Sequence, residues 1–325
     1  MQYICRMRSN NPVLLYACFG VPAERWCREL RRALPQLEIR EWPDAGDPAE
    51  IDYVLAWNHP HGFLRQFPCL RVIFSLGAGV DRLLEDAQLP PDVPLVRMAD
   101  PGLAVLMREF VIMQALYYHR DMPVYQAQQR AALWRQLPPV SASERRVGVM
   151  GMGQIGLHCA EGLRELGFDV RGWGRTPRAG GAGAGGAVAV MSGREGLAPF
   201  LRDLAILVCL LPLTGETRGI LNQKTFSLLA RGAYLIHVAR GPHLVEDDLI
   251  AALDSGQLSG ATIDVFAHEP LPSEHRFWRD PRLILTPHVS ALTRPQTAAP
   301  RLAENIRRDL AGEPLLDVVD RARGY

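Results

Sequence analysis

The sequence predicts an α/β fold with two doubly wound parallel-sheet domains. Apolar runs of strand length alternate with stretches of helical spacing along the 325 residues, which is typical of parallel sheets with helices on both faces. A G-x-G-x-x-G sequence directly follows one central run, as in dinucleotide-binding βαβ units. The helical tail is too short to form a domain, so we expect it to pack back on the first third of the chain.

The first third is predicted to form the core of one domain. Its strands are the apolar runs Val13–Ala17, Tyr53–Trp57 and Val72–Ser75, and Glu24–Ala33 has helical spacing. With the tail, it is expected to make a discontinuous, flavodoxin-like substrate domain of residues 1–98 plus 291–325.

The middle of the chain is predicted to form a Rossmann domain of residues 99–290. It opens with an apolar helix, Glu109–His119, whose sequence is equally compatible with a link between domains and with a subunit interface. The helix Gln154–Leu166 follows the first strand. The expected strands are Arg146–Met150, Phe168–Trp173, Ala205–Leu210, Ala233–Val238, Gly260–Phe266 and Leu283–Thr286.

Composition and charge exclude several classes of function. Thirty-six basic and thirty-five acidic side chains leave a net charge of +1, which predicts binding neither to nucleic acid nor to a membrane surface. No apolar run approaches the ~18 residues of a membrane span. Arg6 and Arg8 before the apolar run 13–21 imitate a signal peptide, but no cleavage site follows, which favours a first strand. Six scattered cysteines predict reduced thiols and a cytoplasmic protein.

The glycine-rich turn predicts a dinucleotide site. Gly151 would permit the tight turn, Gly153 the approach of a pyrophosphate, and Gly156 close packing of helix and strand. The N-terminus of the following helix would meet the anion with free N–H groups. We include the intervening Met152, Gln154 and Ile155 in this site, and the alternative is a glycine-rich turn that binds no ligand.

The end of the next predicted strand favours NADP(H) over NAD(H). NAD sites usually place an acid there to hold the ribose 2′-hydroxyl, but residues 172–178 contain none. Arg175 and Arg178 would pair with a 2′-phosphate, and Thr176 would donate a hydrogen bond. NAD(H) stays possible, because two solvated surface arginines would give the same sequence.

Three polar residues follow late strands, where ligands bind in open α/β sheets: Arg240, Glu269 and His288. Each alone has an ordinary structural explanation. Together they suit hydride transfer to a carbonyl beside a carboxylate, with a cation for the carboxylate, a histidine as proton donor and an acid that orients it. His59 and His61 suggest a metal, but no third ligand lies near them in the sequence, so we expect none.

The chain also resembles the D-2-hydroxyacid dehydrogenase family over nearly its whole length. The resemblance rests on the glycine-rich turn and on Val238-Ala239-Arg240-Gly241, Asp264-Val265-Phe266 with Glu269-Pro270, and Thr286-Pro287-His288. Glu246-Asp247-Asp248-Leu249 and the terminal Val319–Tyr325 are most similar to the bacterial glyoxylate/hydroxypyruvate reductase A group.

The resemblance implies a homodimer that binds a small 2-oxoacid. It implies that Arg240 binds substrate, that His288 is the acid/base and that Glu269 is its partner. The loop Leu76-Gly77-Ala78-Gly79 would bind the substrate carboxylate through backbone amides, with Trp57 and Arg82 on the substrate side. Residues expected to border the cofactor are Leu211, Pro212, Thr217, Val238, Ala239, Asp264 (near the nicotinamide carboxamide) and Ser290.

The expected function is therefore reduction of glyoxylate to glycolate and of hydroxypyruvate to D-glycerate with NADPH. Another dehydrogenase of the family, of the phenylpyruvate, phosphoglycerate or formate type, is the enzymatic alternative. A dinucleotide-sensing interaction protein is the alternative outside enzymes, but sensing alone would not require a proton donor.

Overall fold

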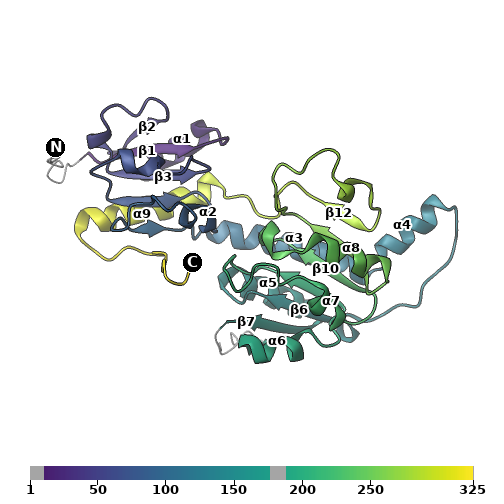
Figure 1. The fold of residues 1–325 in the computed structure, drawn as a ribbon. Helices are drawn as coiled ribbons and strands as arrows, with labels where there is room; N and C mark the ends of the chain where they lie inside the picture. The colour runs from purple at the N-terminus through teal and green to yellow at the C-terminus, as the bar shows by residue number, and fades with distance from the viewer. Residues whose placement is uncertain (1–10, 176–187, 325) are drawn as a thin grey trace. The chain divides into compact units, whose positions relative to one another are not determined.

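The chain folds into two compact units, one of residues 1–103 with 293–325 and the other of residues 104–292 (Figure 1). The computed structural model describes residues 11–175 and 188–324. All pairings between the named strands are parallel. The prediction of two parallel-sheet α/β domains is confirmed.

The first unit contains a five-stranded sheet in the order β2-β1-β3-β4-β5, which is the strand order of flavodoxin-like folds. Its strands are β1 (Val13–Cys18), β2 (Glu38–Glu41), β3 (Tyr53–Trp57), β4 (Val72–Ser75) and β5 (Leu95–Val96). Its helices are α1 (Ala23–Ala33), α2 (Asp81–Leu84) and α9 (Pro295–Ala311).

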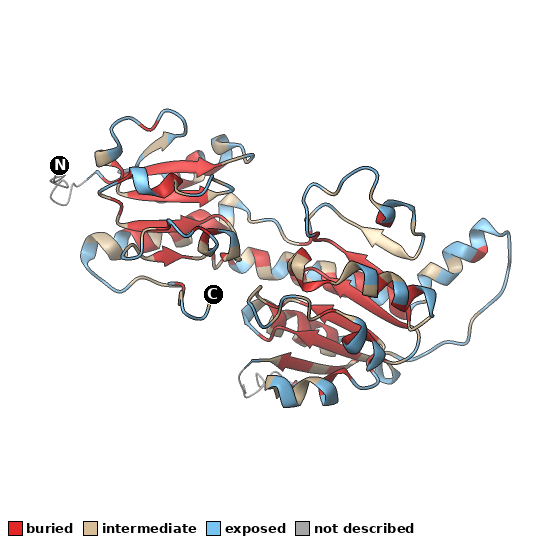
Figure 2. Cartoon of the chain, viewed as in Figure 1, coloured by how far each residue is buried: buried red, intermediate tan, exposed pale blue. Residues whose placement is uncertain are grey.

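The central strands β1, β3 and β4 of this sheet are buried, as Figure 2 shows in red, whereas the edge strand β2 is partly exposed. All six residues of β1 are buried. Alternate residues of the strands serve different cores: Leu14 packs with Trp26 of α1 and Leu302 of α9, whereas Leu15 packs with Phe67 on the opposite face. This two-sided burial explains why the strands are continuous apolar runs.

The C-terminal helix α9 is bonded to the first third of the chain, as predicted. Asp309 accepts hydrogen bonds from the Tyr53 hydroxyl at 2.6 Å and from Arg71 Nε at 2.7 Å. Because Tyr53 lies in β3 and Arg71 directly precedes β4, these hydrogen bonds hold α9 against the sheet. The first unit is therefore discontinuous in sequence.

The second unit contains a seven-stranded sheet in the order β12-β11-β10-β9-β6-β7-β8. This is the Rossmann order with one further strand, and the order reverses between β6 and β9. Its strands are β6 (Arg146–Met150), β7 (Asp169–Gly174), β8 (Ala189–Ser192), β9 (Ile206–Cys209), β10 (Ala233–His237), β11 (Leu258–Ile263) and β12 (Leu283–Leu285). The helices that complete the chain are α3 (Pro101–His119), α4 (Met122–Arg130), α5 (Gln154–Glu165), α6 (Gly193–Leu201), α7 (Gln223–Ser227) and α8 (Glu246–Asp254).

Some expectations are corrected by the structure. Helix α3 begins at Pro101 rather than at Glu109, because proline suits the first helical position and Asp100 accepts a bond from the Gly102 amide at 2.9 Å. Cys18, Cys27, Cys159 and Cys209 are buried free thiols. Cys69, however, is disulfide-bonded. The prediction that all six cysteines are reduced is therefore wrong, because the spacing of cysteines in a sequence does not show which of them lie close together in the fold.

No helix in the described part of the chain is long and apolar enough to cross a membrane.

Candidate active site

The turn after β6 has a backbone shape that only glycine tolerates. Gly151 has φ +99°, and its amide donates to the Trp173 carbonyl at 2.8 Å. A Cβ at this position would lie 2.5 Å from the carbonyl oxygen of Leu210. The turn therefore sits directly against the end of β9, at the point where the strand order reverses.

The start of α5 leaves room for an anion. A Cβ on Gly153 would meet nothing within 4 Å, whereas one on Gly156 would lie 1.8 Å from the Gly151 carbonyl oxygen. Gly153 is the N-cap, and no side chain caps the helix, so its first N–H groups are available. Met152 is buried, Gln154 exposed and Ile155 half-buried. These residues fit a bound dinucleotide phosphate.

The end of β7 places Arg175 on the surface, directly after Gly174. The other two residues predicted to face a 2′-phosphate, Thr176 and Arg178, lie outside the described residues. Their role stays a prediction.

The loop after β9 is held by a threonine hydroxyl. Thr217 Oγ1 donates to the Pro212 carbonyl at 2.7 Å and accepts from the Thr214 amide at 2.8 Å. Leu211 is buried, and Pro212 is half-buried. The loop therefore has a fixed path beside the glycine-rich turn.

Asp264, which follows β11, is fully buried and holds the turn that carries His288. Its carboxylate accepts bonds from Thr286 Oγ1 at 2.5 Å and from the amides of Val289 and Ser290 at 2.8 and 2.9 Å. His288 itself has φ +55°, a conformation that costs energy for a residue other than glycine. The three bonds to Asp264 stabilise this strained turn.

His288 and Glu269 form a direct pair. His288 Nδ1 lies 2.8 Å from Glu269 Oε2, and Glu269 Oε1 accepts the Phe266 amide at 2.9 Å. Burial opposes ionisation of Glu269, but the hydrogen bonds from His288 and Phe266 and the charges of His288 and Arg240 hold its pKa below the usual value. An ionised Glu269 accepts the hydrogen bond from the imidazole and orients the ring.

Arg240 follows β10 and the buried Val238 and Ala239. Its Nη1 donates to the Ala239 carbonyl at 2.7 Å, and its positive charge acts on Glu269. A Cβ on the next residue, Gly241, would lie 1.9 Å from the Phe266 carbonyl carbon. This close approach brings the Arg240 turn against the loop that carries Glu269, so the three predicted catalytic residues are neighbours in the second unit.

The loop after β4 in the first unit has backbone amides that are available to a ligand. Leu76 is buried and its amide donates to Ala56. Within the described residues, the amides of Gly77, Ala78 and Gly79 donate to no acceptor. Three successive N–H groups without a partner suit a carboxylate.

Trp57 and Arg82 lie beside this loop. A Cβ on Gly77 would be 2.6 Å from the Trp57 ring, so the ring packs on the loop. Arg82 Nη1 donates to Asn58 Oδ1 at 2.8 Å. A hollow of about 50 Å³ is lined by Trp57, Asn58, His59, His61, Gly79, Arg82 and Leu83.

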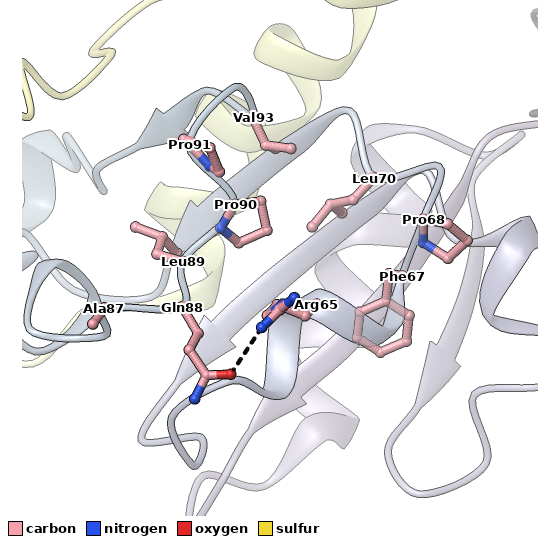
Figure 3. Close-up of a pocket in the computed structure, with 10 residues that line it drawn as sticks. All are labelled: Arg65, Phe67, Pro68, Leu70, Ala87, Gln88, Leu89, Pro90, Pro91 and Val93. Atoms are coloured by element: carbon pink, nitrogen blue, oxygen red, sulfur yellow. Dashed lines mark hydrogen bonds between the residues drawn. The ribbon is translucent and has the colours of Figure 1, made fainter.

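A larger cavity of the first unit, of about 430 Å³, contains none of the predicted site residues (Figure 3). Its lining is mostly apolar and proline-rich, and its one charged side chain, Arg65, is bonded to Gln88 at 3.2 Å. Within residues 11–175 and 188–324, no three His, Cys, Asp or Glu side chains are grouped to hold a metal ion.

The sequence analysis quotes two residues in its motifs, Thr286 and Gly241, without giving either a role in this site. Thr286 bonds to Asp264, and Gly241 allows the Arg240 turn to approach the Glu269 loop. Both lie within two residues of a predicted catalytic residue, but the residues that they contact are seen only in the structure.

Comparisons with known proteins identify the family of this chain. Residues 112–290 match the D-isomer specific 2-hydroxyacid dehydrogenase, NAD binding domain. The glyoxylate/hydroxypyruvate reductase A of Serratia proteamaculans (strain 568) is 44% identical over 308 residues, which are 93% of this chain and 96% of that protein.

Two solved structures are similar over almost the whole chain. A D-isomer specific 2-hydroxyacid dehydrogenase from Xanthobacter autotrophicus Py2, in complex with NADPH and MES, is 43% identical with a TM-score of 0.91, covering 97% of this chain and 100% of that one. An NADPH-dependent glyoxylate/hydroxypyruvate reductase from Sinorhizobium meliloti, in complex with NADP and sulfate, is 38% identical with a TM-score of 0.89 and the same coverage. The chain belongs to the D-isomer specific 2-hydroxyacid dehydrogenase family.

Proposed function

We propose that this protein reduces glyoxylate to glycolate and hydroxypyruvate to D-glycerate with NADPH. The observation that carries the proposal is the bonded pair His288–Glu269 beside Arg240, in the same unit as the glycine-rich turn. A relative of 44% identity that bears the name of this activity supports the choice of substrates.

In the proposed reaction, each site residue has a distinct task. In the second unit, the guanidinium of Arg240 binds the substrate carboxylate and polarises the adjacent carbonyl. In the first unit, the free amides of Gly77, Ala78 and Gly79 are suited to a carboxylate. NADPH, when bound, supplies the hydride. His288 gives its proton to the carbonyl oxygen, and Glu269 orients the imidazole through their hydrogen bond. Trp57 and Arg82 border the rest of the substrate.

The proposal is tested by mixing the protein, NADPH and a panel of 2-oxoacids and following the absorbance of the reduced cofactor. We expect the highest kcat/KM with glyoxylate and hydroxypyruvate. Discrimination against pyruvate and phenylpyruvate depends on pocket volume, where one methylene changes the activation free energy by ~1–3 kcal/mol. Absence of turnover with every 2-oxoacid would contradict the proposed activity.

The proposed cofactor preference depends on Arg175, Thr176 and Arg178, with the carboxamide of the cofactor placed near Asp264. NADP-bound relatives of similar sequence support it. We expect Arg175→Asp to raise the KM for NADPH by about 10- to 100-fold, because a charge-assisted hydrogen bond contributes ~1.5–3 kcal/mol. The KM for NADH should change little. Initial rates with each cofactor measure the effect, and equal KM values for the two cofactors in the parent enzyme would refute the preference.

We also propose that the protein is a homodimer in the cytoplasm. The stretch from α3 through α4 to residue 140 exposes several large apolar side chains: Met113 is 53%, Leu133 52% and Trp134 96% exposed. Several exposed apolar side chains on one segment indicate a surface that contacts another protein chain. The four free thiols Cys18, Cys27, Cys159 and Cys209 support a reducing compartment, whereas the disulfide at Cys69 counts against it.

Sedimentation velocity tests the dimer. The parent should sediment with twice the mass of the 36.1 kDa chain, and the double variant Leu133→Glu with Trp134→Glu should sediment as a monomer, because charges on both sides of a paired surface repel. Leu166→Glu, at a 43% exposed leucine of the α5 C-cap, is the matched control and should stay dimeric. A monomeric parent would rule out this assembly.

A further inference from the structure

The hollow of about 50 Å³ in the first unit adjoins the loop whose amides suit a carboxylate. Gly79 belongs to both, because it lines the hollow and its amide donates to no acceptor in the part of the chain that the structure describes. Trp57 ends β3, the loop follows β4, and these two strands pair in parallel. The hollow therefore lies at the carboxyl edge of the sheet, where open α/β sheets bind ligands.

The walls of the hollow combine an apolar surface with a hydrogen-bond donor. The Trp57 ring packs on the loop, since a Cβ on Gly77 would lie 2.6 Å from it. Across the hollow, Arg82 Nη1 donates to Asn58 Oδ1 at 2.8 Å. A guanidinium has five N–H donors, so this bond orients the group and leaves donors for a ligand.

The segment that follows β3 and forms part of the wall has a fixed path. Asn58 has φ +52°, a conformation that asparagine adopts more readily than most residues. The next ring, His59, stacks on Phe63 with 5.5 Å between the ring centroids. Asp86, which is 3% exposed, accepts the Gly62 amide at 2.8 Å. The hollow is thus preformed, and a group that enters it would not have to order this segment.

The size and chemistry of the hollow select the group that fits. A water-sized group needs about 10–15 Å³ and a cavity that binds benzene measures about 150 Å³, so this hollow has room for a few non-hydrogen atoms and not for a phenyl ring. The Trp57 ring suits a methylene, and the Arg82 guanidinium suits an oxygen that accepts a hydrogen bond. A hydroxymethyl group has both.

We propose that this hollow is the subsite for the hydroxymethyl group of hydroxypyruvate, with Arg82, oriented by Asn58, as the hydrogen-bond donor to its hydroxyl. The inference rests on the proposed function, which supplies the 2-oxoacid. With the carboxylate on the amides of the loop, the third carbon of the acid lies near Gly79 and enters the hollow. Glyoxylate has no third carbon, and the methyl group of pyruvate accepts no hydrogen bond. Arg82 therefore determines specificity among these acids, and Asn58 is a positioning residue.

Two substitutions test the subsite through the ratio of kcat/KM for hydroxypyruvate to kcat/KM for glyoxylate. Arg82→Met keeps an unbranched stem and removes the donors, and it should lower this ratio by about five- to tenfold, as for one lost hydrogen bond at an exposed donor. Asn58→Gly removes the acceptor that orients Arg82 and tolerates the positive φ; it should lower the ratio by about two- to fivefold, because the guanidinium must then be ordered by the substrate. The ratio of pyruvate to glyoxylate should stay near that of the parent in both variants.

The first unit also contains a matched control. Arg65 is exposed and donates to the side-chain oxygen of Gln88 at 3.2 Å, beside the other cavity (Figure 3), so Arg65→Met removes an equivalent pair and should keep the parental ratio. Initial rates at saturating NADPH give kcat/KM for each acid, and thermal melting shows that each variant is folded. If Arg82→Met keeps the parental ratio, or lowers kcat/KM for all three acids by the same factor, the subsite is refuted. A parent that reduces glyoxylate but not hydroxypyruvate would also refute the subsite alone, whereas a parent that reduces no 2-oxoacid would refute the proposed function and the subsite with it.

Discussion

Replacing His288 with Asn is expected to lower kcat for 2-oxoacid reduction by about two to four orders of magnitude, because the variant has no side chain that can give a proton to the carbonyl oxygen. The backbone should be unaffected. His288 has φ +55°, and asparagine is among the residues that adopt this conformation most readily. The bonds from Asp264 to the flanking amides do not involve the imidazole. Initial rates at saturating NADPH and glyoxylate measure the loss.

A second histidine provides the control for this experiment. His268 adjoins Glu269 in the sequence and is exposed, so His268→Asn should retain nearly the full rate. The NADPH Kd and the Tm of the His288 variant should stay close to those of the parent. If His288→Asn keeps the parental rate, the assignment of His288 as proton donor is wrong.

The strands of both sheets could be predicted because burial on two faces leaves a continuous apolar run. Val13–Ala17, Tyr53–Trp57 and Ala233–Val238 correspond to β1, β3 and β10 within one residue. The strands that the sequence did not reveal are edge or peripheral ones. β2 consists of Glu-Ile-Arg-Glu, is half-exposed and lies at the sheet edge, so it carries no apolar signal.

In the candidate site, too, some residues could be identified from the sequence and others could not. Arg240, Glu269 and His288 could be identified because each follows a strand, and the carboxyl ends of parallel strands lie at one edge of a sheet. The residues that hold them in place were not identifiable from such a rule. Asp264 supports the His288 turn through the amides of residues 289 and 290. These contacts depend on the path of the loops, which composition and periodicity do not specify.

Replacing Glu269 with Gln should lower kcat by about 10²-fold at neutral pH. Glutamine has no negative charge to orient the imidazole and to balance the cationic groups around it. Although burial opposes its ionisation, the bonds from His288 and Phe266 hold the pKa of Glu269 below its usual value, so the parent keeps this charge into acid, and its advantage over the variant should shrink only there. The pH dependence of kcat, measured for both proteins from neutral into acid pH, gives the ratio of the two rates.

The lowered pKa of Glu269 fixes the sign of the accompanying stability effect. A carboxyl whose pKa is lower in the folded chain than in the unfolded chain stabilises the folded chain at a pH above the unfolded pKa, which is about 4.3 for an unperturbed glutamate. This stabilisation is lost as the pH falls through the folded pKa. The difference in Tm between the parent and Glu269→Gln should therefore be largest where Glu269 is ionised, and it should shrink in acid. Glu274→Gln removes an acid that bonds only its neighbour Ser273 in this loop, and it should keep the parental pH profile. A Glu269→Gln variant with the parental profile and rate would show that the carboxylate, although bonded to the imidazole, does not assist the reaction.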